Sequence, residues 1–150
     1  GVYTKGVTNG SFSMDNVTAT ATGGTYNYGV FNYNSSSPSM NNVTATATGG
    51  ANAGGVYNIS SSSPSMNNVT ATGTGGTSNY GVFNDSSSPT IRNSSFTGST
   101  NSIRNSGTSS AQVADTMLDG PVGLVAGLTC VGVYTTAFVV LDASCAAVGP

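Results

Sequence analysis

The chain has 150 residues, and only 5% of them are charged, against roughly 25% in an average soluble protein. It contains no Glu, His or Trp, and its formal net charge is −2 with three cations, Lys5, Arg92 and Arg104. The lack of His excludes Ser-His-Asp triads, imidazole bases and His-containing metal sites, and three cations offer little to a phosphate backbone. We therefore expect no enzyme activity, no metal, no cofactor and no nucleic-acid partner.

Two phrases alternate along the first part of the chain, and each recurs at a constant spacing. Copies of MDNVTATATGG and its variants lie at 14–24, 40–50 and 66–76, and copies of GVFNYNSSSPS and its variants lie at 29–39, 55–65 and 81–90. Degenerate copies follow, in which Ile91, Asn93 and Phe96, and then Val113, Asp115 and Leu118, occupy the positions of Met66, Asn68 and Ala71. The chain therefore holds about five units of roughly 22–26 residues, a period typical of repeat architectures.

Each unit consists of short stretches in which polar and apolar residues alternate, separated by Gly, Asn-Asn or Ser-Ser-Ser-Pro. Alternation with period 2 and β-branched residues predicts strands, and the separating residues predict turns. A repeat of this length with two or three strands is typical of one coil of a parallel β-solenoid. A disordered linker is the alternative, but it does not require the apolar position that recurs as Met14, Met40, Met66, Ile91 and Val113.

The coil length and the phrase GVYN…SSSPSMNNVTATATGG resemble right-handed parallel β-helix repeat proteins over roughly residues 1–120. The resemblance implies an all-β, pectate-lyase-like fold of the kind found in bacterial secreted and surface proteins and in phage tail fibres. That fold carries lyases, hydrolases, adhesins and fibres, so it implies no single function. Asp115 and Asp119, the two neighbouring acids, are expected on opposite sides of a bend and make a poor catalytic pair.

Alternation assigns the two faces of each coil. Val17, Ala19 and Ala21 are predicted to point inward, and Val30, Val56, Val82, Ile103 and Val133 to form a second inward column. The threonines between them are predicted to form an outward Thr face, made of Thr18, Thr20, Thr22, Thr44, Thr46, Thr48, Thr70, Thr72 and Thr74.

Two further columns are predicted. An exposed aromatic column contains Tyr3, Phe31, Tyr57, Phe83 and Tyr134, with Arg104 at the same position in the fourth unit. An Asn ladder, hydrogen-bonded along the stack as in other stacked β structures, contains Asn16, Asn42, Asn68, Asn93 and Asp115. We expect this ladder to be structural rather than to bind a ligand.

Residues 121–150 are the most apolar part of the chain and are predicted to form a small C-terminal β module, distinct from the solenoid of residues 1–120. Gly and Thr interrupt the module, which argues against a transmembrane helix. It is expected either to cap the last coil or to lie against a neighbouring subunit. Its two cysteines, Cys130 and Cys145, are the only ones in the chain and predict a disulfide, with two free thiols as the alternative. A disulfide implies an oxidising, extracellular or cell-surface location.

Three non-catalytic functions are consistent with this pattern. The first is a structural subunit of an extracellular fibre or appendage, whose partners are other copies of itself joined head to tail. The second is a glycan-binding adhesin or a module like those of phage tail fibres, with sugars stacked on Tyr57 and its neighbours. The third is ice binding through the Thr face, an arrangement that resembles that of solenoid ice-binding proteins.

Overall fold

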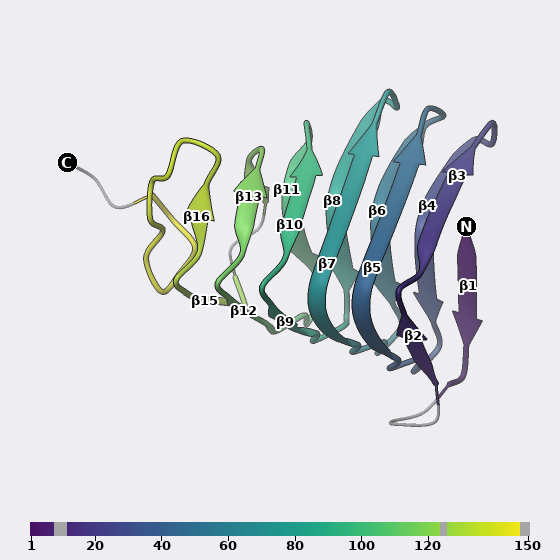
Figure 1. Ribbon diagram of the computed structural model, residues 1–150, viewed down its shortest axis with the longest axis horizontal. Coiled ribbons are helices and arrows are strands. Elements are labelled where there is room, and N and C mark those ends of the chain that lie inside the picture. The colour runs from purple at the N-terminus through teal and green to yellow at the C-terminus, as the bar shows by residue number, and fades with distance from the viewer. Residues whose placement is uncertain (8–11, 124–125, 148–150) are drawn as a thin grey trace.

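A computed structural model of the protein describes residues 1–7, 12–123 and 126–147. The structure contains two β-sheets, in each of which parallel strands are stacked along the solenoid axis. Figure 1 shows this stack from β1 at one end to β16 at the other. Sheet A contains, in stacking order, β1 (Val2–Lys5), β4 (Tyr26–Tyr33), β6 (Asn52–Ile59), β8 (Ser78–Asp85), β11 (Asn101–Ser106) and β14 (Val122–Gly123). The predicted parallel β-solenoid is thereby confirmed.

Sheet B is bent into two facets. The Ser facet contains β2 (Ser13–Asp15), the first halves of β5 (Ser39–Thr48) and β7 (Ser65–Thr74), then β9 (Thr90–Arg92), β12 (Ala111–Ala114) and β15 (Leu128–Val131). The Thr facet contains β3 (Thr18–Thr22), the second halves of β5 and β7, then β10 (Ser95–Gly98), β13 (Met117–Asp119) and β16 (Tyr134–Thr135). In Figure 1 the strands of the Thr facet point upward in front, and the strands of sheet A point downward behind them. Successive coils advance from right to left, so the chain follows a right-handed path.

The predicted register is confirmed in the regular coils, where Met40 pairs with Met66 and Val43 with Val69. The apolar column continues through Ile91 and Val113 to Cys130, and its residues are at most 3% exposed. Phe96 and Leu118 fill the core position that Ala71 holds in the third coil. The stack makes about four turns, slightly fewer than the five expected. Strands after Ser106 are only two to four residues long.

The bend between the two facets explains one of the predicted columns. At this bend the backbone has a positive φ at six equivalent positions along the described stack, with φ between 46° and 62°, namely Asn16, Asn42, Asn68, Asn93, Asp115 and Gly132. Asn, Asp and Gly tolerate this left-handed conformation better than other residues. The structure here differs from the expected Asn ladder, because the side chains of this corner column are exposed and only Asn68 and Asn42 within it bond to each other, at 2.5 Å.

A continuous amide ladder runs instead through the interior, along the inner face of sheet A. Asn32 donates to Asn58 at 2.8 Å, Asn58 to Asn84 at 2.9 Å and Asn84 to Asn105 at 3.0 Å, each through Nδ2 to Oδ1. Thr4 begins the chain of bonds by donating its hydroxyl to Asn32. All four asparagines are at most 2% exposed, so the amides of Asn32, Asn58 and Asn84 depend on the next coil for an acceptor. The Nδ2 of Asn105, at the end of the column, is buried without a partner among the described residues. We call this set the buried Asn ladder.

A parallel column of serines stabilises the adjoining turn. The backbone N–H of Ser36 donates to the Ser62 hydroxyl, that of Ser62 to Ser87 and that of Ser87 to Ser109, each at 3.1 Å. These serines are buried as well. The Ser-Ser-Ser-Pro phrases therefore supply hydrogen bonds between coils in addition to forming turns.

The stack does not end at residue 120, where the C-terminal module was expected to begin. Strands β14, β15 and β16 pair in parallel with β11, β12 and β13, so the solenoid continues to Thr135. Residues 136–147, which we call the cap, then fold back over the last coil with antiparallel pairing. The other residues expected in the module, 124–125 and 148–150, lie outside the described residues.

The cap is attached by backbone bonds and by the predicted disulfide, which the structure confirms. Leu141 N donates to Val133 O at 2.8 Å, and Cys130 N donates to Ala143 O at 3.0 Å. The disulfide joins Cys145 of the cap to Cys130 of β15, with 5.3 Å between the Cα atoms. Of the two expectations for this segment, the structure shows a cap over its own coil.

The turn inside the cap is organised by one carboxylate. Asp142 accepts hydrogen bonds from the Ser144 hydroxyl at 2.7 Å and from the Ser144 and Ala146 N–H groups at 2.8 and 3.0 Å. The Ser144 hydroxyl, followed by the two backbone donors, holds the pKa of Asp142 below its ordinary 3.8. Since the folded-state pKa is lowered, this stabilisation of the turn is present above pH 3.8 and is lost as the pH falls through the lower folded-state value.

The corner column predicts different outcomes for two substitutions of Asn42. Asn42→Gly should leave the free energy of unfolding nearly unchanged, because Gly readily adopts a positive φ. Asn42→Ala should lower it by about 1–2 kcal/mol, because its β-carbon disfavours the left-handed conformation. Chemical denaturation followed by circular dichroism measures both. Equal destabilisation by the two variants would show that the bond to Asn68 matters more than the backbone conformation.

The buried Asn ladder predicts that Asn58→Ala strongly lowers the free energy of unfolding. The variant leaves Asn32 Nδ2 without an acceptor and Asn84 Oδ1 without a donor, and each buried unpaired group costs about 1–3 kcal/mol. Asn67→Ala is the matched control, because Asn67 also accepts one amide bond but is exposed. Chemical denaturation should show a much larger loss in the free energy of unfolding for Asn58→Ala than for Asn67→Ala. Similar losses in the two variants would contradict the structural role of the ladder.

The disulfide should contribute about 3 kcal/mol to the free energy of unfolding, given the short loop that it closes. Urea denaturation of the wild-type protein with and without reductant measures this contribution. A Cys130→Ala/Cys145→Ala variant should match the reduced protein and should not respond to reductant. Equal stability of the oxidised and reduced wild-type protein would show that the backbone bonds alone hold the cap.

Candidate functional surfaces

The acidic residues are dispersed over the solenoid. Asp115 lies at the corner between the facets, whereas Asp119 lies on the Thr facet, where it accepts a hydrogen bond from the Thr97 hydroxyl at 3.4 Å. Among the residues that the structure describes, no three His, Cys, Asp or Glu side chains gather in a group that could hold a metal ion. The candidate sites described below are surfaces.

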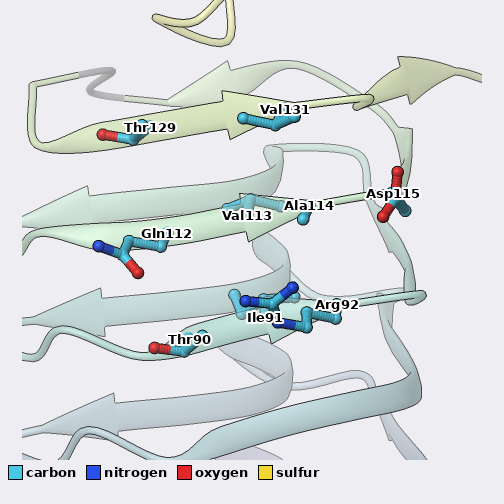
Figure 2. A pocket seen from close by; sticks show the side chains of 9 residues that line it. All are labelled: Thr90, Ile91, Arg92, Gln112, Val113, Ala114, Asp115, Thr129 and Val131. Carbon is cyan, nitrogen blue, oxygen red and sulfur yellow. The ribbon is translucent and has the colours of Figure 1, made fainter.

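A hollow of about 310 Å³ lies on the Ser facet where β9, β12 and β15 meet (Figure 2). Ala114 lies between Arg92 and Val131 in the same column, and its short side chain leaves the space between these two larger residues. Figure 2 shows Arg92 on one wall and Asp115 at the corner. Arg92 is exposed, so the hollow offers one solvated cation above an apolar floor. The sequence reasoning did not anticipate it.

The aromatic column follows sheet A. Tyr3 is 57% exposed, whereas Phe31, Tyr57 and Phe83 are half-buried. Successive ring centroids lie 5.4, 6.1 and 4.4 Å apart. Arg104 ends the column with its guanidinium 5.8 Å from the Phe83 ring centroid, a cation–π contact.

Tyr134 does not belong to this column. It pairs with Met117 on the Thr facet and stacks on Phe138, with 6.1 Å between the ring centroids. The expected alignment fails because the last coil is short: Val122, rather than Val133, pairs with Ile103. Val133 is buried as expected but lies on the other side of the coil, just before β16.

The rings of the aromatic column cover one another. Tyr28 and Tyr57 stack at 4.3 Å, and a β-carbon at Gly54 would lie 2.9 Å from the Tyr57 ring, so only Gly leaves room for this packing. Burial raises the pKa of both tyrosines above the ordinary 10.0. The column therefore presents ring edges to solvent over most of its length, with Tyr3 the most exposed ring.

The nine threonines of the predicted Thr face all lie on the outside of the Thr facet. Seven are exposed, and Thr46 and Thr72 in the middle column are half-buried. Strand pairing aligns each with its equivalent in the next coil, so that Thr20, Thr46 and Thr72 form one row along the axis. Within the described part of the chain, none of the nine hydroxyls makes a hydrogen bond to protein.

The cap carries an exposed apolar surface, the cap face, formed by Phe138, Val139 and Val140, which are 83%, 42% and 59% exposed. Phe138 also has a φ of 59°. Its N–H donates to Thr135 O at 2.8 Å, which closes a tight turn in which Gly would be favoured. Sequence reasoning missed this residue, because a positive φ at Phe has no signal in the residue pattern.

Comparison of the chain with family models, curated proteins and solved structures finds no match. In the described ranges, no helix is long and apolar enough to span a membrane.

Proposed function

We propose that the protein is a non-catalytic structural subunit of an extracellular fibre or appendage whose copies join end to end along the solenoid axis. Phe138 is the observation that carries this proposal. Its side chain is 83% exposed and its backbone has a φ of 59°, a conformation that costs a residue with a β-carbon about 1–2 kcal/mol. Neither burial nor backbone preference accounts for an aromatic residue at this position, whereas contact with another molecule does.

The surroundings of Phe138 support a role in assembly. Its ring lies parallel to that of Tyr134, with an angle of 3° between the two planes, and Val139 and Val140 extend the apolar surface. Aromatic residues, Phe among them, are enriched in the buried cores of protein interfaces. The cap that presents them is fixed covalently through Cys145, so little conformational entropy is lost when a partner binds.

The opposite end of the described stack also exposes aromatic side chains. In the described residues, β1, β2 and β3 pair on one side only, and Tyr3 and Tyr26 are 57% and 63% exposed. A contact between this end of one copy and the cap face of the next is heterologous, so it propagates into a filament. Strands β14 to β16, which could have paired between chains, pair within their own chain, so we assign the contact to cap side chains instead.

Location and rigidity agree with this proposal. The disulfide favours an oxidising, extracellular compartment, and the resemblance to β-helix repeat proteins favours a surface or fibre protein. The buried Asn ladder and the serine column connect successive coils, as a rod under tension requires. Glycan binding has less support, because sugars stack on free ring faces, and most faces in the aromatic column are covered by neighbouring rings.

Phe138→Gly separates assembly from folding. Monomer stability should rise, because Gly relieves the positive φ, while end-to-end assembly should be lost with the aromatic side chain. Sedimentation velocity over a range of concentrations and electron microscopy measure assembly, and thermal denaturation measures stability.

Ser61→Gly is the matched control, because Ser61 is also exposed with a positive φ of 64° but lies in a turn of the regular coils. It should gain similar stability and assemble like the wild-type protein. A wild-type protein that stays monomeric by light scattering at high concentration overturns the proposed function. Unchanged assembly of Phe138→Gly overturns the role of the cap face.

A further inference from the structure

We propose that the Thr facet is a second binding surface and that its ligand is ice. The facet lies along the side of the solenoid and is separate from the ends that the proposed fibre contact uses. Its candidate binding residues are the nine threonines of β3, β5 and β7 described above.

The threonines form a two-dimensional grid. Thr18, Thr20 and Thr22 pair with their equivalents in β5, and those pair in turn with β7, without a bulge within the three rows. Neighbouring coils of a sheet lie about 4.8 Å apart, and alternate residues of one strand lie about 6.6 Å apart. The facet therefore repeats a hydroxyl and a methyl group at fixed intervals in two directions, as a crystal surface of water molecules also does.

The backbone beneath the grid is held rigidly. A β-carbon on Gly29 would lie 2.7 Å from Thr46 N, and one on Gly55 would lie 2.4 Å from Thr72 N. Sheet A and the Thr facet thus touch through their backbones at these positions, and Ala45 and Ala71 fill the remaining space with no exposure to solvent. A surface that must hold water at fixed positions benefits from such a support, because the lattice cannot adapt to a moving template.

The chemistry of the facet differs from that of the rest of the coil. The hydroxyls of Ser36, Ser62 and Ser87 bond to protein inside the solenoid, whereas the nine threonine hydroxyls are free to bond water. Strands β3, β5 and β7 present no charged side chain on this facet, and the first acid in the middle row is Asp119, two coils beyond Thr72. Charged groups order water around themselves, so their absence from the grid favours a uniform water layer.

Ice is favoured over the other extended ligand, the surface of a crystalline polysaccharide. Polysaccharide surfaces are bound by the flat faces of aromatic rings, and the described aromatic residues of the first three coils lie on sheet A or outside the Thr facet. Hydroxyl and methyl groups on a rigid lattice match ordered water instead.

The test measures ice growth in solutions of the purified protein. The wild-type protein should shape ice crystals, separate the freezing and melting points, and slow recrystallisation. Thr46→Tyr, at the centre of the grid, should abolish most of this effect, because the larger side chain prevents the facet from lying flat against the ice surface. Thr46→Ser, which keeps the hydroxyl but removes the methyl group, should lower the effect to an intermediate value.

Ser65→Tyr is the matched control, because Ser65 is an exposed strand residue of the same sheet on the Ser facet. It should leave ice shaping unchanged, and circular dichroism should show that all variants fold. A wild-type protein that does not alter ice growth, or equal activity of Thr46→Tyr and wild type, overturns the proposal. Binding to crystalline cellulose or chitin that Thr46→Tyr abolishes, without any effect on ice, assigns the facet to a polysaccharide and overturns it as well. None of these outcomes depends on end-to-end assembly.

Discussion

The buried asparagines of sheet A take their hydrogen-bond partners from the neighbouring coils, and this constraint governs much of the rest of the structure. An amide such as Asn58, with no exposure to solvent, is satisfied only if Asn32 and Asn84 stand at the same position in the neighbouring coils. A buried amide without a partner costs more than its hydrogen bond contributes. The recurrence of Asn at one position in each unit follows from this requirement, because a change of register would unpair the ladder.

The same constraint explains what the degenerate coils retain. The fourth coil loses the threonine grid and introduces Phe96 and Arg104, yet it keeps Asn105 and Ser109, which continue the two internal columns. In this coil a core residue and solvent-facing residues change, while the residues that hydrogen-bond between coils are kept. The corner column varies in another way: Asn, Asp and Gly all occur in it, because a positive φ rather than an amide is what the corner requires.

At the C-terminal end of the described stack, a cap lies over the last coil. Beyond Ser106 the strands shorten, and residues 136–147 cross the last coil and are fixed there by Cys145. Covering terminal strand edges is one way in which β proteins limit uncontrolled pairing. The cap covers backbone edges but exposes Phe138, and it thereby replaces a generic strand edge by a specific apolar surface. An end contact made by side chains can be selective for one partner, which a bare strand edge is not.

The sequence by itself determined the solenoid, the register of its regular coils and the disulfide, because repeat spacing, alternation and an isolated cysteine pair are local or periodic signals. Alternation also predicts an inward side chain at Asn32, because Asn32 follows the inward Val30 by two positions. The corner asparagines recur with the same period, however, so periodicity alone does not distinguish the two columns. Tertiary structure decided the rest. The position of Tyr134 depends on the number of turn residues in the last coil. The position of the cap and the exposure of Phe138 depend on where the chain folds back. These features involve non-repeating segments, in which no neighbouring copy reveals the register and only the packing of the whole coil selects the path.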